Sequence, residues 1–489
     1  MNLHINFRPI IHVIGLLLIA LAVVMLIPLL AEEVIEGHAN AFFEEGVVVS
    51  GVFGALLVLA SRDNTEFSLD VKQAFLMTAC CWIVLPVFAA IPLVGITGKS
   101  GASLSFTDAV FETVSGITTT GSTVISGLDG LHPGFLLWRS LLNWIGGIGI
   151  IVMAIVMLPF LRIGGMQLFR SESSDRSEKI VPKSAEMVKW IIWTYIGLTV
   201  ACAIGYGIAG MSAFDAINHA MATLATGGFS THDASFGAFG TAARWVAIVF
   251  MIAGGLPFIL YIKLLRGRKR ALRDDPQVRT FLMFLIVVSL LGAVVLSQDA
   301  GLEFGTALTE VAFSVVSIVT TTGFASSDYT AWGTGAVAAF FILTFVGGCA
   351  GSTSGAIKIY RFQVLWITLR HQLQRLTSPH RVIPLQYKGA RMADDLPLSV
   401  LAFMAAFFAS IAVVTTLLAL MGVDFVTALS ASATAITNVG PGLGPIVGPS
   451  GNFASLPDAA KWILSFAMLL GRLEIFTLLM LFDPHFWRD

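Results

Sequence analysis

Four short stretches of the sequence place a threonine or asparagine two residues before a glycine, and we call them the glycine segments. Glycine adopts positive φ without steric cost, which allows consecutive backbone carbonyls to face one axis. Rings of such carbonyls replace the hydration shell of a monovalent cation and suit potassium. One such segment is typical of an ordinary turn, but four in matching positions predict a ring of ligands. The predicted ligands are the carbonyls of Thr119, Thr120, Gly121, Thr226, Gly227, Gly228, Thr321, Thr322, Gly323, Asn438, Val439 and Gly440.

A short stretch precedes each glycine segment and is not long enough to cross a bilayer. Residues 106–121 match residues 308–323 without a gap. The stretch before Gly228 has an acid, and the stretch before Gly440 has a phenylalanine, at the same distance from the glycine as in residues 106–121. We therefore expect four re-entrant half-helices, each followed by an extended glycine segment. The C-terminal end of a helix carries the negative end of its dipole, so these ends favour a cation.

Acidic residues stand on both sides of the glycine segments. Asp108, Asp215 and Glu310 are expected to begin three half-helices, where a carboxylate caps free backbone N–H groups. Three more acids follow the glycines within a few residues, namely Asp129, Asp233 and Asp328. These three either concentrate cations at an outer mouth or are solvated loop acids.

An arginine interrupts the last apolar stretch. The stretches after the other glycine segments contain a Gly-Gly pair, whereas the last one contains Gly471-Arg472. A charge inside a membrane span is costly and faces either a partner or an aqueous path. Arg472 is therefore one half of a structural ion pair or a barrier below the ring, with Glu474 expected to pair elsewhere.

A run of small and polar residues breaks the apolar stretch after the third glycine segment. No Gly-Lys-[Ser/Thr] follows it, so we do not expect a nucleotide-binding loop. We predict a movable gate here, with a static helix kink as the alternative. Together with Arg472, the predicted gate residues are Gly347, Gly348, Cys349, Ala350, Gly351, Ser352, Thr353, Ser354 and Gly355.

Apolar stretches that approach the roughly 20 residues needed to span a bilayer must position these residues. Ten are expected, at residues 10–30, 47–61, 74–94, 134–161, 188–209, 243–265, 281–296, 336–361 (interrupted), 398–421 and 459–482. Two of them separate successive glycine segments, so all four segments share one orientation. We predict an all-α membrane protein with two N-terminal transmembrane helices and four parallel helix–re-entrant pore loop–helix repeats around one pseudo-fourfold pore. The predicted divisions are 1–68 for the extra helices, then 69–183, 184–277, 278–391 with a broken inner helix, and 392–489.

Composition and charge agree with a membrane protein. The chain of 489 residues is 56% hydrophobic and 12% charged, about half the charge of an average soluble domain. Of its 29 Lys and Arg residues, 20 fall within residues 162–189, 263–279 and 358–391. The positive-inside rule places these segments and both termini in the cytoplasm. The four cysteines are expected to be buried free thiols rather than disulfides or metal ligands.

The sequence resembles the membrane subunit of the bacterial Trk-type potassium uptake system, within the Trk/Ktr/HKT superfamily. The resemblance covers essentially the whole chain and is carried by the four glycine segments, Gly347–Gly355, Asn438–Gly442 and Gly471–Glu474. It implies a homodimer with one pore per subunit, an intramembrane gating loop at Gly347–Gly355 and a pore arginine at Arg472. It also implies a cytosolic nucleotide-binding regulatory ring as partner. Glycine at all four signature positions is the potassium-selective pattern of the family.

These observations predict potassium uptake through the bacterial inner membrane by a gated, selective pore. A cation-coupled potassium symporter is the alternative, although such carriers often use inverted repeats and mid-membrane acids. No nucleophile–base pair or metal-spaced histidine cluster is apparent, so an enzyme is not expected. Potassium is expected as the transported ion, with no nucleotide bound by this chain itself.

Overall fold

A computed structural model describes residues 6–37, 41–62, 70–96, 103–157, 184–378 and 384–488. Within these ranges the regular elements are helices, apart from one hairpin of β1 (Gln386–Tyr387) and β2 (Ala390–Arg391). The end of the span predicted at 134–161, most of the basic segment 162–189 and the divisions predicted at 68–69 and 183 lie outside the described residues.

Seven single helices in the described part of the chain are long and apolar enough to cross a membrane. They are α1 (Arg8–Glu36), α2 (Ala41–Ala60), α3 (Val71–Ala89), α5 (Pro133–Met157), α7 (Ser184–Ile208), α12 (Pro276–Ala300) and α16 (Leu396–Leu420). Each coincides with a predicted span. Side chains such as Val48, Leu291 and Leu398 are largely exposed on them, as expected of surfaces that face hydrocarbon.

Two spans predicted as continuous helices are sharply bent, so those two predictions were wrong in detail. The first consists of α9 (Thr241–Gly254) and α10 (Phe258–Leu265), which meet at 92°. Pro257 stands at this bend, and proline cannot donate the backbone hydrogen bond that a continuous helix needs. The second consists of α19 (Asp458–Arg472) and α20 (Ile475–Leu481), which meet at 110° where Glu474 has a φ of 54°.

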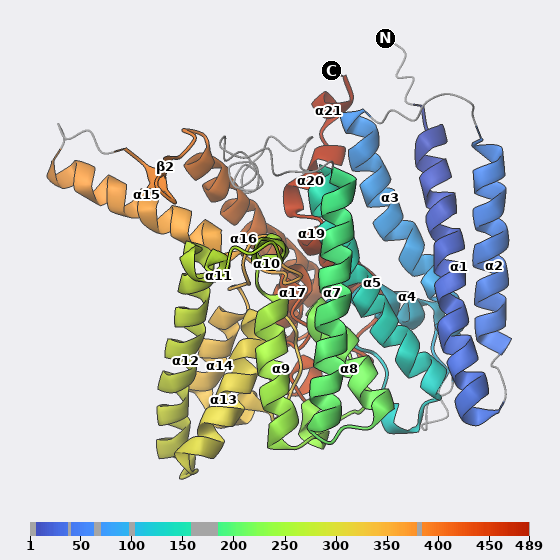
Figure 1. The fold of residues 1–489 in the computed structure, drawn as a ribbon, viewed down its shortest axis with the longest axis horizontal. Coiled ribbons are helices and arrows are strands. Elements are labelled where there is room, and N and C mark those ends of the chain that lie inside the picture. The colour runs from blue at the N-terminus through green and yellow to red at the C-terminus, as the bar shows by residue number, and fades with distance from the viewer. Residues whose placement is uncertain are drawn as a thin grey trace.

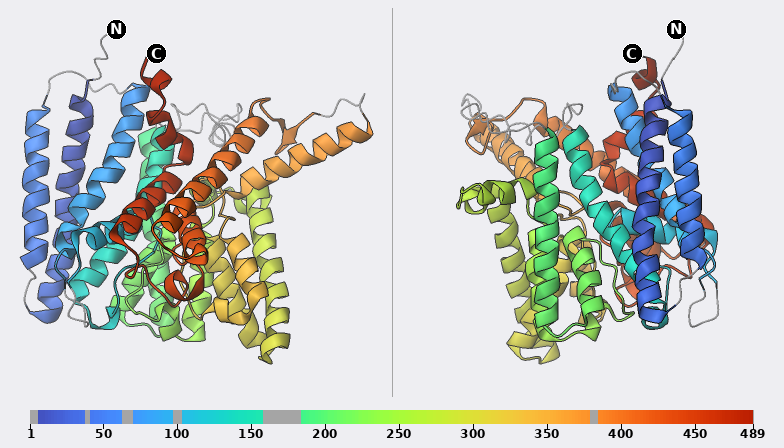
Figure 2. Two further views of the ribbon diagram at one scale, coloured as in Figure 1. Left: turned by 180° about the vertical axis from the view of Figure 1, so that it is seen from behind. Right: turned by 45° about the vertical axis from the view of Figure 1, so that its right-hand side comes forward.

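The interrupted stretch predicted at 336–361 is confirmed as interrupted. Its first half is α14 (Thr334–Leu343) and its second half is α15 (Ile359–Thr377), and we call the connection loop 344–358. Figures 1 and 2 show α15 extending sideways from the body of the protein. The opposite edge is formed by α1 and α2, which pack against each other.

Four shorter helices lie between the spans and precede the glycine segments. They are α4 (Phe106–Ile117), α8 (Ala213–Ala225), α13 (Phe304–Val319) and α17 (Phe425–Thr437). The helix that follows a short helix also packs against another of the short helices. Helix α5, which follows α4, packs against α8, and α9, which follows α8, packs against α13. In the same way α19, which follows α17, packs against α4. The remaining short elements are η1 (Ile91–Leu93), η2 (Leu128–Gly130), η3 (Ser235–Ala238), η4 (Tyr329–Trp332), α11 (Ala271–Asp274), α18 (Gly444–Val447) and α21 (Pro484–Arg488).

Two apolar clusters surround the glycine segments. One joins residues of α1, α4, α5, α17 and α19, and the other joins residues of α7, α8, α9, α12 and α13. The beginning of α1 and the end of α21 lie at the same end of the molecule (Figure 1). The four cysteines are free, and three of them are buried.

Candidate ion pathway

Serine and aspartate side chains fix where three of the half-helices begin. Ser105 caps α4 and Ser212 caps α8, because each hydroxyl accepts a hydrogen bond from the backbone N–H three residues later. Asp108 and Asp215 are therefore not the capping residues themselves. Each instead accepts a hydrogen bond from its capping serine, at 2.9 and 2.7 Å. In α17 the cap is Asp424, which sequence reasoning did not identify.

The prediction that Glu310 begins a half-helix was wrong. Helix α13 starts at Phe304, so Glu310 lies in its second turn. Its carboxylate accepts hydrogen bonds from Arg244 of α9 and from the hydroxyls of Ser326 and Ser327. Glu310 therefore ties the half-helix to a neighbouring span and to the chain after the third glycine segment.

The four glycine segments have the same backbone conformation. In each, the first and third residues are left-handed and the middle residue is not. The φ values are 53° at Thr119 and 83° at Gly121, 50° at Thr226 and 75° at Gly228, 58° at Thr321 and 80° at Gly323, and 56° at Asn438 and 108° at Gly440. Alternation of hand allows neighbouring carbonyls to face the same side, and threonine holds a left-handed φ only where the surroundings impose it.

The glycines bring the four segments together in a closed cycle. A Cβ atom added to Gly121 would lie 2.4 Å from the carbonyl oxygen of Gly227, in the second segment. One added to Gly228 would lie 2.0 Å from the oxygen of Thr322, and one added to Gly323 would lie 2.0 Å from the oxygen of Val439. The cycle closes because a Cβ at Gly440 would lie 2.7 Å from the oxygen of Thr120. Only glycine permits these approaches.

Side chains join the fourth segment to the first. The Ser122 hydroxyl donates to the carbonyl oxygen of Gly440 at 2.8 Å. The Asn438 amide donates to the Thr120 hydroxyl at 3.0 Å and to the carbonyl oxygen of Met468, in α19, at 2.9 Å. Asparagine therefore replaces the threonine of the other segments with a side chain long enough to make these cross-links.

A buried ion pair behind the first segment was missed from the sequence. Glu112 of α4 and Arg139 of α5 are 0% and 1% exposed, and their charged groups are 2.8 Å apart. Glu112 also accepts a hydrogen bond from the N–H of Val124, while Arg139 donates to the carbonyl oxygen of Ser230 and covers the ring of Phe229. The pair thus holds the chain after the first segment and reaches the chain after the second.

The corresponding place in the second half-helix is occupied by a histidine. His219 is buried, and its Nε2 lies 2.9 Å from the hydroxyl of Ser230. Its Nδ1 lies 2.8 Å from the carbonyl oxygen of Asp215, which indicates that Nδ1 carries the proton. His219 and Glu112 both stand nine residues before the glycine of their segment. That shared spacing was the sequence signal that could have identified Glu112 and His219 as equivalent positions.

The C-terminal ends of the segments open into a cavity of about 80 Å³ that Gly121, Gly228, Gly323 and Gly440 all line. Asp233 lines it too, but its carboxylate accepts a hydrogen bond from the N–H of Gly127.

The other two acids predicted near this mouth have defined partners. Asp129 lies 2.5 Å from His232, and this hydrogen bond is the main reason that the pKa of Asp129 is lower than usual. Asp328 caps η4. The structure thus gives all three predicted mouth acids local hydrogen-bond roles.

Loop 344–358 lies against the N-terminal ends of three segments. Its Gly355 N–H donates to the Thr321 hydroxyl at 2.6 Å, and its Ala356 N–H donates to the carbonyl oxygen of Thr437 at 2.8 Å. The Thr353 hydroxyl lies 3.3 Å from that of Thr226 and donates to the carbonyl oxygen of Leu224 at 3.0 Å.

The rest of the loop is held by backbone hydrogen bonds within the loop and to the residue that follows α9. The N–H of Gly347 donates to the carbonyl oxygen of Ile357, and the N–H of Cys349 donates to that of Gly255. Loop 344–358 is therefore a polar connection, and most of its hydrogen bonds are not those of a helix.

Arg472 lines a cavity of about 90 Å³ below the segments, together with Ser354 and Gly355 of the loop. It is 4% exposed, and two of its guanidinium nitrogens have no hydrogen-bond partner among the described residues. The expectation that Glu474 pairs elsewhere is confirmed, because Glu474 lies 2.9 Å from Arg361. Arg472 therefore faces the cavity without an acidic partner in the part of the chain that the structure describes.

One group of possible metal ligands occurs among the described residues, and it lies away from the segments. The ligand atoms of Glu32, Glu36 and His132 are all within 4.8 Å of one another, where α1 ends and α5 begins. His132 Nδ1 lies 2.6 Å from the Glu36 carboxylate, so a hydrogen bond accounts for this contact.

Apolar spans, half-helices that end inside the protein and a closed ring of backbone define a polytopic membrane transport protein. The chain belongs to the TrkH family of cation transport proteins, whose family model matches residues 38–488. This membership confirms the resemblance seen in the sequence.

Individual relatives match over nearly their whole length. The chain is 47% identical over 486 residues to the Trk system potassium uptake protein TrkI of Halomonas elongata, covering 99% of this chain and 98% of that protein. It is 36% identical over 492 residues to the Trk system potassium uptake protein TrkH of Escherichia coli K12, covering 99% and 100%. The crystal structure of the potassium transporter TrkH from Vibrio parahaemolyticus superposes with a TM-score of 0.89 at 34% identity, covering 99% and 100%.

Proposed function

We propose that this protein mediates potassium uptake through a gated, selective pore in the inner membrane. The observation that carries the proposal is the closed cycle in which each glycine abuts a carbonyl of the next segment. Backbone carbonyls held in such a cycle supply oxygen ligands for a dehydrated monovalent cation. The names of the relatives support potassium as the ion.

The proposed selectivity filter consists of the four glycine segments, with the carbonyls predicted from the sequence as ligands. The proposed architecture has four parallel units around one pseudo-fourfold axis, at 69–183, 184–277, 278–391 and 392–489, with 1–68 outside them. The packing of α5, α9 and α19 against the half-helix of the next unit supports this arrangement. The half-helices end immediately before the segments, so their dipoles favour a cation there.

The proposed gate is Gly347–Gly355 together with Arg472. Hydrogen bonds from loop 344–358 to Thr321 and to the carbonyl of Thr437 support a loop that closes the inner end of the filter. The Arg472 guanidinium beside the same loop, two of whose nitrogens have no hydrogen-bond partner among the described residues, supports an electrostatic barrier to cations. Opening would require the loop to leave at least these contacts.

The remaining parts of the proposal concern orientation and assembly. Both termini are placed in the cytoplasm by the positive-inside rule, and α1 begins at the same end of the molecule where α21 finishes (Figure 1). We propose that the protein forms a homodimer and binds a cytosolic nucleotide-binding regulatory ring, because the family resemblance implies both. The basic segments predicted to be cytoplasmic would supply positive charge for docking this ring.

Flux through the purified protein tests the proposal. Reconstituted in liposomes, the protein should pass potassium in preference to sodium and show discrete single-channel currents. Smooth potassium uptake that requires a proton or sodium gradient would instead identify a coupled carrier. Absence of potassium flux both with and without the cytosolic partner would contradict the proposed function.

A further inference from the structure

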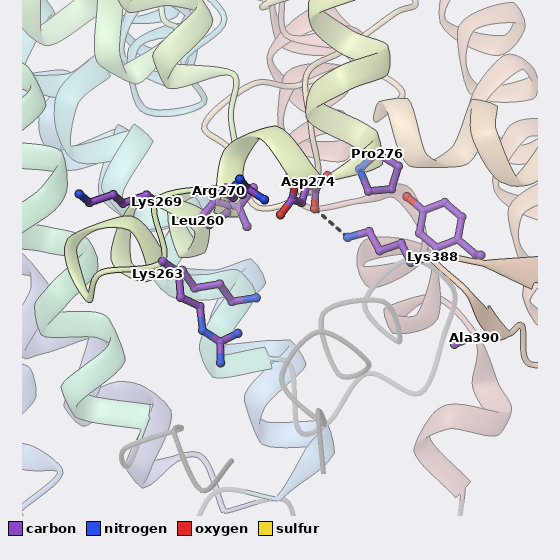
Figure 3. Close-up of a pocket in the computed structure, with 12 residues that line it drawn as sticks. Leu260, Lys263, Lys269, Arg270, Asp274, Pro276, Lys388 and Ala390 are labelled. Atoms are coloured by element: carbon purple, nitrogen blue, oxygen red, sulfur yellow. Dashed lines mark hydrogen bonds and ion pairs between the residues drawn. The ribbon is translucent and has the colours of Figure 1, made fainter. Parts of the chain in front are cut away.

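A basic cavity of about 860 Å³ lies apart from the proposed pore, between the α10–α12 connection and the β1–β2 hairpin. Figure 3 shows Lys263, Lys269 and Arg270 on one side of it and Lys388 on the other. Arg268 also lines it, so five cationic side chains meet there against two acids, Asp274 and Asp275. A cavity of this size accommodates a small-molecule ligand, and its charge selects an anion.

Three of these cations have no partner among the residues that the structure describes. The side chains of Lys263, Lys269 and Arg270 make no ion pair or hydrogen bond with any described residue. Lys263 is only half-exposed in the last turn of α10, whereas Lys269 and Arg270 are exposed. Because like charges repel, a cluster of this kind is stabilised when an anion enters it.

The opposite wall contains a tight hairpin turn, and Asp275, one of the two acids, is ion-paired there. Lys388 has a φ of 51° and Gly389 a φ of 79°, as a tight two-residue hairpin turn requires. This turn holds Lys388 against Asp275 at 2.9 Å, and Asp275 also caps α12 through the N–H of Gln277. The start of α12 is therefore occupied by Asp275, so an anion in the cavity must be bound by side chains.

In the orientation proposed above, on which this inference rests, the basic segment 263–279, and therefore this cavity, lies on the cytoplasmic side of the membrane. The 92° bend after α9 turns α10 away from the direction of α9, so a membrane-spanning α9 would leave α10 lying along the membrane surface. Leu264 and Leu265 at its end are 37% and 65% exposed, and Arg266 covers the ring of Trp190 on the neighbouring α7. Exposed leucine and tryptophan beside clustered cations are typical of a site where lipid tails and headgroups meet.

We propose that this cavity binds the phosphate-bearing headgroup of an anionic phospholipid of the cytoplasmic leaflet. The headgroup phosphate would contact Lys263 and Arg270, and the acyl chains would lie along the exposed leucines of α10. A lipid fits the site better than a free anion does, because the cations adjoin apolar surface. A bound lipid would link the α9–α12 connection to the hairpin that follows α15.

Native mass spectrometry of the delipidated protein tests this proposal, with phosphatidylglycerol and phosphatidylcholine of identical acyl chains as probes. The wild-type protein should retain phosphatidylglycerol more strongly. The double variant Lys263→Gln/Arg270→Gln should bind it roughly 25-fold more weakly, at about fivefold for each charge near the membrane surface. The matched control Arg370→Gln/Arg375→Gln removes two exposed cations from α15 and should bind as the wild type does. The charge-keeping variant Lys263→Arg/Arg270→Lys should bind nearly normally if it is folded.

Four results would overturn the proposal. Equal retention of the two lipids would remove the charge selectivity, and an equal loss in the α15 control would show that only the overall charge matters. Displacement of phosphatidylglycerol by an excess of inorganic phosphate would assign the site to free phosphate. Unchanged lipid binding in the double variant, together with lost binding of a polyglutamate peptide, would assign it to an acidic protein. Potassium flux of the wild type is measured separately, so failure of the pore proposal is distinguishable from failure of this one.

Discussion

The backbone N–H of Gly355 donates a 2.6 Å hydrogen bond to the side-chain oxygen of Thr321. The first residue belongs to the loop between α14 and α15, and the second begins the third glycine segment with a left-handed φ of 58°. The two elements proposed as gate and filter are therefore in direct contact. The Ser354 hydroxyl also lies 3.3 Å from the same threonine oxygen.

Replacing Thr321 with valine should favour the open state. Valine keeps the shape of threonine but leaves the partly buried Gly355 N–H without this acceptor, at a cost of about 1–3 kcal/mol to the closed loop. Potassium flux measured without a cytosolic partner should therefore rise by roughly tenfold or more. The control is Thr119→Val, because Thr119 holds the equivalent position and its hydroxyl has no hydrogen-bond partner within the described ranges. Equal effects of the two substitutions would place the effect in the filter rather than in the loop.

Removal of the Arg472 charge should also increase flux. A unit charge about 5 Å from the ion path opposes a cation by roughly 3 kcal/mol at an effective dielectric constant near 20, or on the order of a hundredfold in rate. Arg472→Ala should therefore conduct faster, whereas Arg472→Lys, which keeps the charge, should not. Flux is measured in liposomes and the melting temperature in detergent.

Arg361→Ala supplies the structural comparison for Arg472. Because Arg361 lies 2.9 Å from Glu474, its loss should lower the melting temperature by removing the buried half of a partly exposed pair. Arg472→Ala should be better tolerated, since it removes a charge with no partner among the described residues. A stronger loss of folded protein in Arg472→Ala than in Arg361→Ala would favour a structural role for Arg472.

The glycine segments could be predicted because repetition fixes their spacing. In all four segments, the left-handed first residue and the glycine at the end occupy the same aligned positions. The second segment, with Ala225-Thr226-Gly227 before its glycine, follows the same backbone as the others although it has fewer hydroxyl groups. The conformation therefore depends on the glycine and on packing more than on the threonines.

The parts that could not be predicted depend on contacts distant in sequence. Glu112 and Arg139 are 27 residues apart, and only the packing of α4 against α5 brings them together. The bend at Pro257 had a local signal, because a proline follows two glycines, but a hydropathy pattern extends across it. The bend at Glu474 had none, since a left-handed glutamate is imposed by its surroundings.

A serine at Gly121 should reduce the preference for potassium over sodium. Gly121 has a φ of 83° and approaches the Gly227 carbonyl, so a side chain there must displace a neighbouring ligand. Backbone strain of about 1–3 kcal/mol corresponds to a loss of selectivity of roughly tenfold. The ratio of potassium to sodium flux measures this effect, and an unchanged ratio would contradict the filter assignment.

Serine at Gly323 should reduce the ratio of potassium to sodium flux more than serine at Gly121 does. A Cβ at Gly323 would lie 2.0 Å from the Val439 oxygen and 2.9 Å from Pro441, whereas the closest approach at Gly121 is 2.4 Å. Gly301 serves as the control, because it has a φ of 64° but no atom within 4 Å of an added Cβ. Gly301→Ser should therefore leave the flux ratio unchanged, and a change there would show that left-handed strain alone is sufficient.

The Glu112–Arg139 pair should stabilise the first glycine segment in particular, in addition to the folded protein. Breaking a buried pair by removing one partner costs about 3–5 kcal/mol, because the remaining charge is left uncompensated. Arg139→Leu should lower the melting temperature more than Glu112→Gln does, since Arg139 also binds the Ser230 carbonyl and covers Phe229. The double variant should be less destabilised than the sum of the two single variants. Because this pair holds the chain after Gly121, the increase in melting temperature caused by potassium should shrink in both variants. Lys388→Gln breaks a pair that joins the β1–β2 hairpin to the start of α12 and should leave that potassium effect intact. An equal loss of the effect in Lys388→Gln would show that the Glu112–Arg139 pair contributes only general stability.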